Sequence, residues 1–255
     1  MKISVLASGS KGNSSYIETK NTKILVDIGM PTLYIERKLK KINVNPEEIK
    51  GIILTHTHVD HINGLKVFIK KYDTKVYLTE KMLEDINNIF ELKNYELITN
   101  YFNIDDLEVE VIKTSHDASD SNGYIFKSEN KSISYITDTG YINRKYKEKL
   151  TNRDIYVIES NHDIKMLMEG KYPYHLKQRI YGDNGHLSNE MASKYLTEYI
   201  GTETKEIILI HLSHENNTEE KALETLKEKL KEKNIDFNNI IISSQNENTE
   251  LIEIW

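Results

Sequence analysis

Two patterns of apolar residues alternate along the chain and predict its secondary structure. Short runs rich in Ile, Val and Tyr, bounded by Gly, Asn, Asp or Ser, are typical of β-strands. Longer stretches with apolar residues three and four positions apart are typical of amphipathic helices. Strands are expected at 2–7, 14–19, 23–29, 51–56, 75–79, 107–116, 122–129, 131–140, 154–160, 206–213, 239–244 and 249–255. Helices are expected at 32–42, 62–72, 80–90, 189–201 and 218–233.

The order of these elements predicts the fold class. Strands cluster early and in the middle of the chain, and helices are interspersed through both halves. This order favours an α/β protein in which two sheets pack face to face with helices outside, a four-layer αβ/βα sandwich. No linker-like or low-complexity segment interrupts the 255 residues, so a single domain is expected over 1–255.

The amino-acid composition bears on the cellular compartment of the protein and on its partners. The absence of cysteine excludes disulfides and thiolate metal sites and fits a reducing cytosol. No apolar run approaches the roughly 18–20 residues of a membrane helix, and the N-terminal apolar stretch is too short for a signal peptide. We therefore expect a cytoplasmic protein without a membrane partner. The net charge of -6 argues against a broad basic face for duplex nucleic acid and leaves room for a local basic groove.

The most distinctive stretch follows the expected strand 51–56 and reads HTHVDH. It places His56, His58, Asp60 and His61 within six positions. Side-chain alternation along a strand points positions 56, 58 and 60 the same way, and a turn can add His61. Imidazole and carboxylate groups bind zinc, iron or manganese. Four such groups are too many for one open metal site, but they suit two ions about 3.5–4 Å apart that share a bridging hydroxide.

A simpler explanation is a surface turn in which Asp60 caps a helix. With only nine histidines in 255 residues, chance clustering of three of them is the weaker explanation. Asp60 could also cap a helix and bind a metal at once.

Three further candidate ligands each follow an apolar run directly. His116 follows LEVEVIKTS, Asp138 follows SISYIT and His211 follows EIILI. Singly, each has another explanation: a polar loop residue, a turn former and a hydrogen-bonded strand-end histidine. Because strand ends and their loops commonly carry functional sites, the shared placement favours one joint site.

These motifs resemble the metallo-β-lactamase superfamily from Met1 to Trp255. HTHVDH matches its H-x-H-x-D-H signature, LVDIG resembles its D-x-G turn, and TSHDA, ITDTG and IHLSHENN resemble its later metal motifs in order. Within the superfamily, LASGSKGNSSYIE, ESNHD, GHLSNE and HLSHENN resemble the WalJ/YycJ branch of compact bacterial DNA-processing exonucleases. The resemblance implies the metallo-β-lactamase fold, with two mixed sheets and helices outside.

The resemblance also implies a site for two divalent metal ions, zinc or manganese first and iron as a further option. It assigns the ligands as follows: His56, His58 and His116 to one ion, Asp60, His61 and His211 to the other, Asp138 as the bridge, and Asp27 as a residue that orients a ligand. The flavodiiron branch has a glutamate where this chain has His58, and the secreted β-lactamases use a cysteine ligand that this chain lacks. Both differences argue against membership of those branches.

The segment 163–185 and its flanking histidines bear on substrate choice. Basic and aromatic residues alternate there, which suits a single nucleic-acid strand, although a solvated helical hairpin explains them as well. His162 and His186 flank the segment, and either is a candidate to donate a proton to the leaving oxygen or to bind the scissile phosphate; a structural role is the alternative. His211 is preferred to His214 as a ligand because it directly follows the strand. The GSKGNSS turn could cradle a phosphate or form a plain hairpin turn.

The predicted function is that of a metal-dependent phosphodiesterase acting on a nucleic-acid strand, a 5′→3′ exonuclease on DNA that uses a metal-bridging hydroxide. Asp60, His162 and His186 are its candidate catalytic residues. A small-molecule hydrolase of the same fold, acting on a thioester, lactone or cyclic phosphodiester, is the alternative. A binding protein without turnover is disfavoured by the complete ligand set. The sequence does not determine the identity of the metal, the choice between DNA and RNA as substrate, the direction of cleavage or the oligomeric state.

Overall fold

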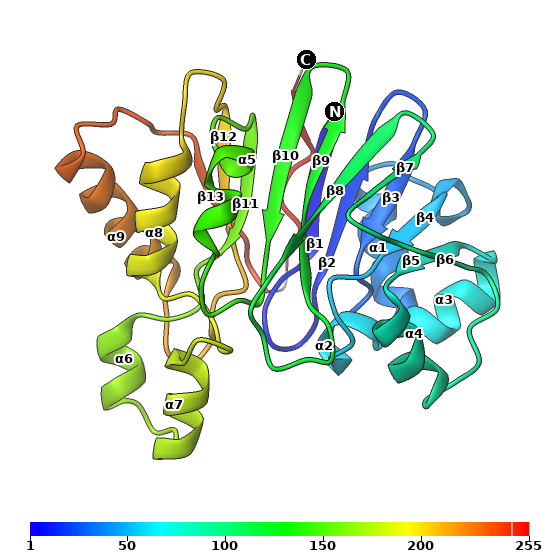
Figure 1. Ribbon diagram of the computed structural model, residues 1–255, viewed down its shortest axis with the longest axis horizontal. Coiled ribbons are helices and arrows are strands. Elements are labelled where there is room, and N and C mark those ends of the chain that lie inside the picture. Colours follow the sequence, from blue (N-terminus) through cyan, green and yellow to red (C-terminus); the bar gives the residue numbers. More distant parts are fainter. Residues whose placement is uncertain (246, 255) are drawn as a thin grey trace.

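Two mixed β-sheets form the centre of the computed structural model, which describes residues 1–245 and 247–254 (Figure 1). Among these residues the first sheet has the strand order β14-β1-β2-β3-β4-β5-β6 and the second β13-β12-β11-β10-β9-β8-β7. Pairing is antiparallel from β1 to β3 and parallel from β3 to β6. It is likewise antiparallel from β7 to β10 and parallel from β10 to β13.

The first sheet comprises β1 (Lys2–Ala7), β2 (Ser14–Glu18), β3 (Lys23–Val26), β4 (Gly51–Ile53), β5 (Lys75–Leu78), β6 (Tyr95–Leu97) and β14 (Ile252–Glu253). The second comprises β7 (Tyr101–Ile104), β8 (Leu107–Lys113), β9 (Asn122–Ser128), β10 (Lys131–Ile136), β11 (Ile155–Glu159), β12 (Glu206–Ile210) and β13 (Ile240–Ile242). The helices are α1 (Thr32–Lys41), α2 (Val59–Ile62), α3 (Leu65–Tyr72), α4 (Glu80–Asn87), α5 (Lys147–Leu150), α6 (Ile164–Glu169), α7 (Tyr174–Tyr181), α8 (Asn189–Tyr199) and α9 (Glu219–Glu232), with 3-10 turns at Pro46–Glu48 and Arg144–Tyr146.

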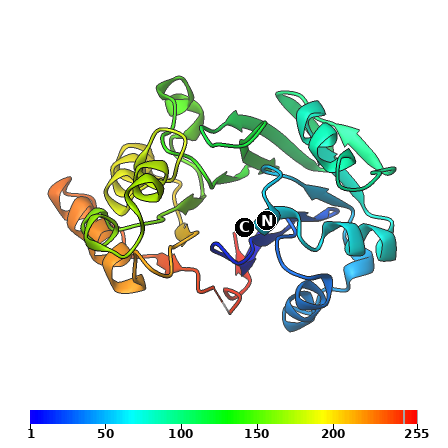
Figure 2. The same ribbon diagram turned by 90° about the horizontal axis from the view of Figure 1, so that it is seen from below.

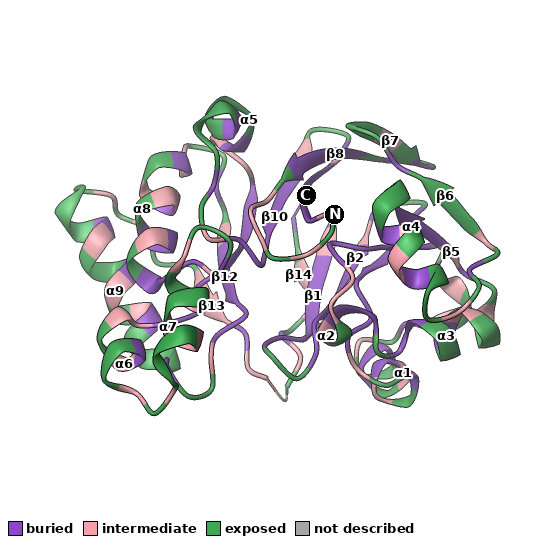
Figure 3. Ribbon diagram, turned by 60° about the horizontal axis from the view of Figure 1, so that its bottom comes forward, coloured by how far each residue is buried: buried purple, intermediate pink, exposed green. Residues whose placement is uncertain are grey.

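Three apolar cores separate the four layers. Strand alternation divides β3, so that Ile24 and Val26 enter the core between the sheets while Leu25 faces the helices. The outer core of the first sheet includes residues of α1, α3 and α4, and that of the second includes residues of α5, α8 and α9. Figure 2 shows these helices outside both sheets, and Figure 3 shows buried strands beneath helices with exposed outer faces. The predicted four-layer sandwich is therefore confirmed.

Several boundaries differ from the prediction. The helix expected at 62–72 begins only at Leu65, and α2 is a separate short helix before it. Between them, the backbone nitrogen of Gly64 donates to the carbonyl oxygen of Ile28 at 2.9 Å instead of bonding within a helix. Strands β6 and β7 were not expected, since much of their surface is exposed and no buried apolar pattern marks them. The strand expected at 249–255 is reduced to β14, and Trp255 lies outside the described residues. No helix in the described ranges has the length and apolar character needed to cross a bilayer.

Candidate metal centre

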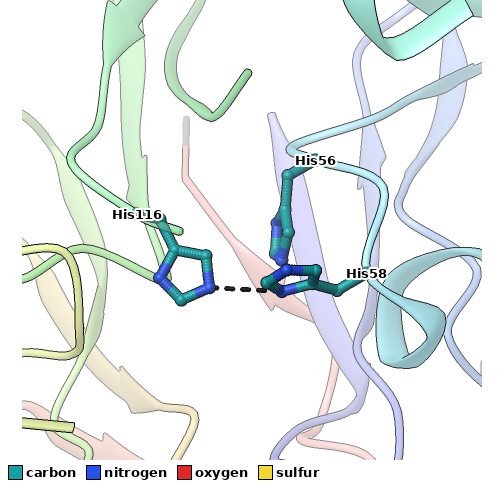
Figure 4. A group of neighbouring side chains, drawn as sticks. All are labelled: His56, His58 and His116. Carbon is teal, nitrogen blue, oxygen red and sulfur yellow. Dashed lines mark hydrogen bonds between the residues drawn. The ribbon is translucent and has the colours of Figure 1, made fainter. Parts of the chain in front are cut away.

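The predicted ligands come together where strands of both sheets end. Asp27 follows β3, the HTHVDH segment follows β4, and His116 comes from the loop after β8. Asp138 follows β10 and His211 follows β12. The segments after β4 and β8 are far apart in sequence, yet their histidine rings face one another (Figure 4). Face-to-face packing of the sheets thus places strand ends from both halves of the chain at one site.

Three of these residues have an unusual backbone conformation. Asp27, Asp138 and His211 have φ angles of 60°, 50° and 57°. These values lie in the left-handed region, which residues other than glycine seldom adopt. Each stands immediately or almost immediately after a strand, so the left-handed turn redirects its side chain from the sheet face to the strand end. Backbone strain of this kind tends to concentrate at functional sites.

The D-x-G turn and HTHVDH segment are in close backbone contact. A Cβ at Gly29 would lie 1.7 Å from the carbonyl oxygen of Asp60, so only glycine fits there. Asn13, in the GSKGNSS turn, donates from its backbone nitrogen to the same oxygen at 2.8 Å, and its side-chain nitrogen lies 3.0 Å from His61 Nε2. This turn therefore supports Asp60 and His61. Asp60 itself lies in the first turn of α2, and the N-cap is His58.

The donor atoms form overlapping groups of metal-ligand size. Atoms of His56, His58 and His116 lie within 4.8 Å of one another, and so do those of Asp60, His61 and His211. Asp138 stands between the groups. Its Oδ2 is 3.3 Å from His61 Nε2, and its Oδ1 is 3.8 Å from His116 Nε2. The seven predicted ligands thus lie close together. Two of the donor groups contain the residues that the resemblance implies, and two further groups join Asp138 to His56 and His61 and to Glu159, His186 and His211.

Two buried nitrogens give a test of whether a metal fits here. His56 and His211 are 0% and 3% exposed, and neither Nε2 atom has a hydrogen-bond partner among the described residues. A buried polar atom without a partner is costly, and a metal ion bound at each nitrogen would remove that cost. Imidazole and carboxylate donors without thiolates suit divalent ions. The residues present therefore fit divalent metal binding.

The electrostatics also favour cations. Burial alone would raise the pKa of Asp138, but the His211 and His61 imidazoles hold it well below its usual range. Burial lowers the pKa of His56, whereas at His61 the opposing effect of Asp27 and Asp138 prevails and raises the pKa to about 10. The carboxylates thus remain ionised and attract positive charge, which bound metal ions also supply.

Two buried carboxylates, those of Asp27 and Glu159, accept hydrogen bonds from the Nδ1 atoms of histidines at the centre and so orient their rings. Asp27 Oδ2 accepts from His61 Nδ1 at 2.7 Å, and Thr55 also donates to both oxygens of Asp27. Glu159 Oε1 accepts from His211 Nδ1 at 2.8 Å and from His186 Nδ1 at 2.7 Å. Such contacts set the tautomer of a ligating imidazole and leave its Nε2 free for the metal.

Glu159 is the functional candidate that sequence reasoning missed. It is 0% exposed and ends β11. Burial by itself would raise its pKa, but the charge and hydrogen bond of His186, with the bond from His211, lower it to about 2. The sequence feature that could have identified Glu159 is an acidic residue at the end of an apolar run, and the same feature identified Asp138.

A cavity of about 270 Å³ opens over the centre. The metal-centre side chains that line it are those of His58, Asp60, His116, Asp138 and His211, joined by His186. The predicted segment 163–185 forms α6 and α7 and supplies the opposite wall through Tyr172, Leu176, Arg179 and Ile180. Arg179 pairs with Asp117, next to His116, and so ties α7 to the centre.

The other histidines are placed differently. His162 is 0% exposed, is absent from the cavity lining, and has its pKa lowered to about 4 by burial. His214 has a side chain 72% exposed, in contrast to buried His211. His175 is exposed on α7. Of the two histidines proposed as proton donors, only His186 therefore lies at the cavity.

Comparison with known proteins identifies the family to which the chain belongs. Residues 22–212 match the model of the Beta-lactamase superfamily domain. The chain is 39% identical over 238 residues to the exodeoxyribonuclease YycJ of Bacillus anthracis, covering 91% of this chain and 90% of that one. It is 40% identical over 232 residues to the exodeoxyribonuclease WalJ of Streptococcus pneumoniae, covering 88% and 86%.

Solved structures with the same fold are more distant in sequence. The metallo-beta-lactamase fold protein YhfI from Bacillus subtilis superposes with a TM-score of 0.73 at 16% identity, over 97% of this chain and 98% of that one. The short form of human tRNase Z superposes with a TM-score of 0.68 at 15% identity, over 98% and 99%. At such identities the superpositions establish the fold alone.

Proposed function

Because the chain belongs to the β-lactamase superfamily and is a metal-dependent hydrolase, we propose that it degrades DNA strands as a 5′→3′ exonuclease. The observation that carries this proposal is the identity of 39% and 40%, over 91% and 88% of the chain, to two proteins named exodeoxyribonucleases. The cavity between the metal centre and α7 supports it. We propose that residues 1–255 act as one hydrolase domain.

Two divalent ions, zinc or manganese first and iron as a further option, are proposed to bind the two donor groups. His56, His58 and His116 would hold one, Asp60, His61 and His211 the other, with Asp138 between them. When bound, the ions would activate a water molecule and neutralise charge on the phosphate. Asp60 lines the cavity and would also orient that water.

His186 is the proposed proton donor to the leaving oxygen. Its Nδ1 is held by Glu159 at 2.7 Å, which leaves Nε2 for the substrate. His186 also lines the cavity, whereas buried His162 does not. A positioned imidazole of this kind typically contributes about 10²–10⁴-fold to a rate. We therefore assign proton donation to His186 and a supporting role to His162.

The α7 wall offers contacts suited to a strand. Tyr172, Leu176 and Ile180 present aromatic and aliphatic surface on which bases can stack or pack, and Arg179 adds one positive charge. Lys177 instead donates to the carbonyl oxygen of Met168 and closes the α6–α7 hairpin. With so few cationic contacts, strand affinity should fall with salt along a shallow slope.

A degradation assay tests the function directly. Single-stranded DNA labelled at either end, its duplex and the matching RNA would be incubated with metal-loaded protein. We expect nucleotides to be released from the 5′ end of DNA, inhibition by chelator, and recovery on adding manganese or zinc. Bis-p-nitrophenyl phosphate serves as a small ester control. Hydrolysis of that ester without degradation of any strand would contradict the nuclease proposal and favour a small-molecule hydrolase.

Glu159→Gln tests the carboxylate behind His211 and His186. The amide keeps the size of the side chain but loses the charge that orients both imidazoles, so we expect kcat/KM or metal affinity to fall about 10–100-fold. The visible spectrum of the Co²⁺-substituted protein should also change, because the His211 ligand would be less well oriented. Glu148→Gln, at an exposed position of α5, is the control. An unchanged spectrum with normal kcat/KM would rule out the positioning role.

A further inference from the structure

A second cavity, of about 300 Å³, adjoins the metal cavity. Two chain segments run from one cavity to the other. Ser10 lines the metal cavity and Lys11 the second, while Ser213 lines both and His214 only the second. Because neighbouring Cα atoms are about 3.8 Å apart, the two cavities lie side by side.

The lining of the second cavity is rich in hydroxyl groups. Ser213, Thr218, Ser243 and Ser244 all contribute to it, together with the amides of Asn217 and Gln245. Hydroxyls and amides can donate several hydrogen bonds to one group with many acceptor oxygens. A phosphate is such a group.

Ser243 supplies the observation that points to a ligand. The residue is 3% exposed, and its Oγ has no hydrogen-bond partner among the described residues, although its backbone nitrogen donates to Leu209 at 2.9 Å. Leaving a buried hydroxyl unsatisfied is costly unless a ligand completes its hydrogen bonding. Because Ser243 lines the cavity, an acceptor bound there would do so.

Charges of both signs surround this cavity, and the first turn of α9 carries Glu219 and Glu220. Helix α9 is 14 residues long and begins at Glu219, so its positive end lies at the cavity. Lys11 is exposed and forms no ion pair with a residue that the structure describes. Glu219 opposes an anion, and His214 is 3.5 Å from Glu215. Among the described lining residues, the Lys11 ammonium group and the helix end attract an anion, and the Glu219 carboxylate repels it.

We propose that the second cavity binds a phosphate group of the substrate strand, one that adjoins the phosphate at the metal centre. The inference rests on the proposed function, because it takes the substrate to be a nucleic-acid strand. Lys11 supplies charge, and Ser243 donates the hydrogen bond that fixes the phosphate. Anchoring a second phosphate aligns the strand across the metal centre.

Lys11→Ala and Ser243→Ala test the phosphate site. Binding is measured by fluorescence anisotropy with metal-loaded protein and a 3′-labelled phosphorothioate strand that resists cleavage, bearing either a 5′-phosphate or a 5′-hydroxyl. Ser243→Ala should weaken binding about tenfold or more, as expected for a hydrogen bond to a charged group. Lys11→Ala should weaken it about three- to tenfold, because its charge is exposed to solvent.

Two control variants separate a local effect from a general one. Lys20→Ala removes the same charge from an exposed lysine elsewhere on the surface. Thr74→Val, just before β5, removes another buried hydroxyl for which the described part of the chain offers no hydrogen-bond partner. Both should bind strands as the unchanged protein does. Ser243→Ala should keep its melting temperature, because the lost hydroxyl has no hydrogen-bond partner among the residues that the structure describes.

The outcomes separate this inference from the proposed function. Weaker binding of the 5′-phosphate strand alone assigns the cavity to the strand end, and equal weakening of both strands assigns it to an internal phosphate; either supports the inference. Normal binding by both variants overturns it, even if DNA is degraded. If the protein binds strands through this cavity but degrades none of them, the phosphate site is supported and the nuclease proposal is overturned. A protein that binds no strand overturns both.

Discussion

Asp138→Ala should lower turnover by about a thousandfold or more and release at least one metal ion per chain. Asp138 lies 3.3 Å from His61 Nε2, 3.6 Å from His211 Nδ1 and 3.8 Å from His116 Nε2, so it stands between the two donor groups. A carboxylate in that position would serve both ions. Metal content per chain and the rate of strand degradation measure the effect together.

The control for this variant is a carboxylate close in sequence to the site. Asp120 pairs with Lys113 in the loop that also carries His116, but it belongs to neither donor group. Asp120→Ala should keep its full metal content and turnover. If Asp138→Ala retained two metal ions and normal turnover, the bridging assignment would be wrong.

His211→Ala and His214→Ala form a matched pair with very different expected results. His211 is 3% exposed, is oriented by Glu159, and has an Nε2 without a hydrogen-bond partner among the described residues. Its removal should lower activity by about a hundredfold or more, since an ion would lose a ligand and Glu159 would lose a partner. His214, with its side chain 72% exposed, should change activity much less.

Metal affinity and strand-degradation rates of both variants test this pair. Their melting temperatures show whether either substitution unfolds the protein. A large loss with His214→Ala and normal activity with His211→Ala would reverse the assignment and show that the ligand lies beyond the strand end.

The cluster at the strand ends was predictable because it depends on local rules. An apolar run followed directly by a histidine or aspartate identified His116, Asp138 and His211, and strand alternation grouped the HTHVDH residues. The structure brings all of them together. The same rule applies to Glu159, which directly follows the apolar run IYVI, but the prediction did not include this residue.

Other features depend on packing between distant segments. His162 and His186 look equivalent in sequence, yet one is fully buried and the other lines the cavity. The helix expected at 62–72 starts at Leu65, after a backbone hydrogen bond from Gly64 to Ile28, a residue far away in the chain. The exposed strands β6 and β7 carry no buried apolar pattern that could have revealed them.

By itself, then, the sequence determined the layered α/β architecture and the set of metal-capable side chains, because hydrophobic periodicity and residue chemistry are local properties. Only the tertiary structure decided which histidine faces the cavity, which carboxylate holds two imidazoles, and which hydroxyls, such as that of Ser243, are buried with no partner in the described ranges. These outcomes depend on burial and on distances between segments far apart in the chain. Side-chain packing sets both, and no pattern within a single segment records them.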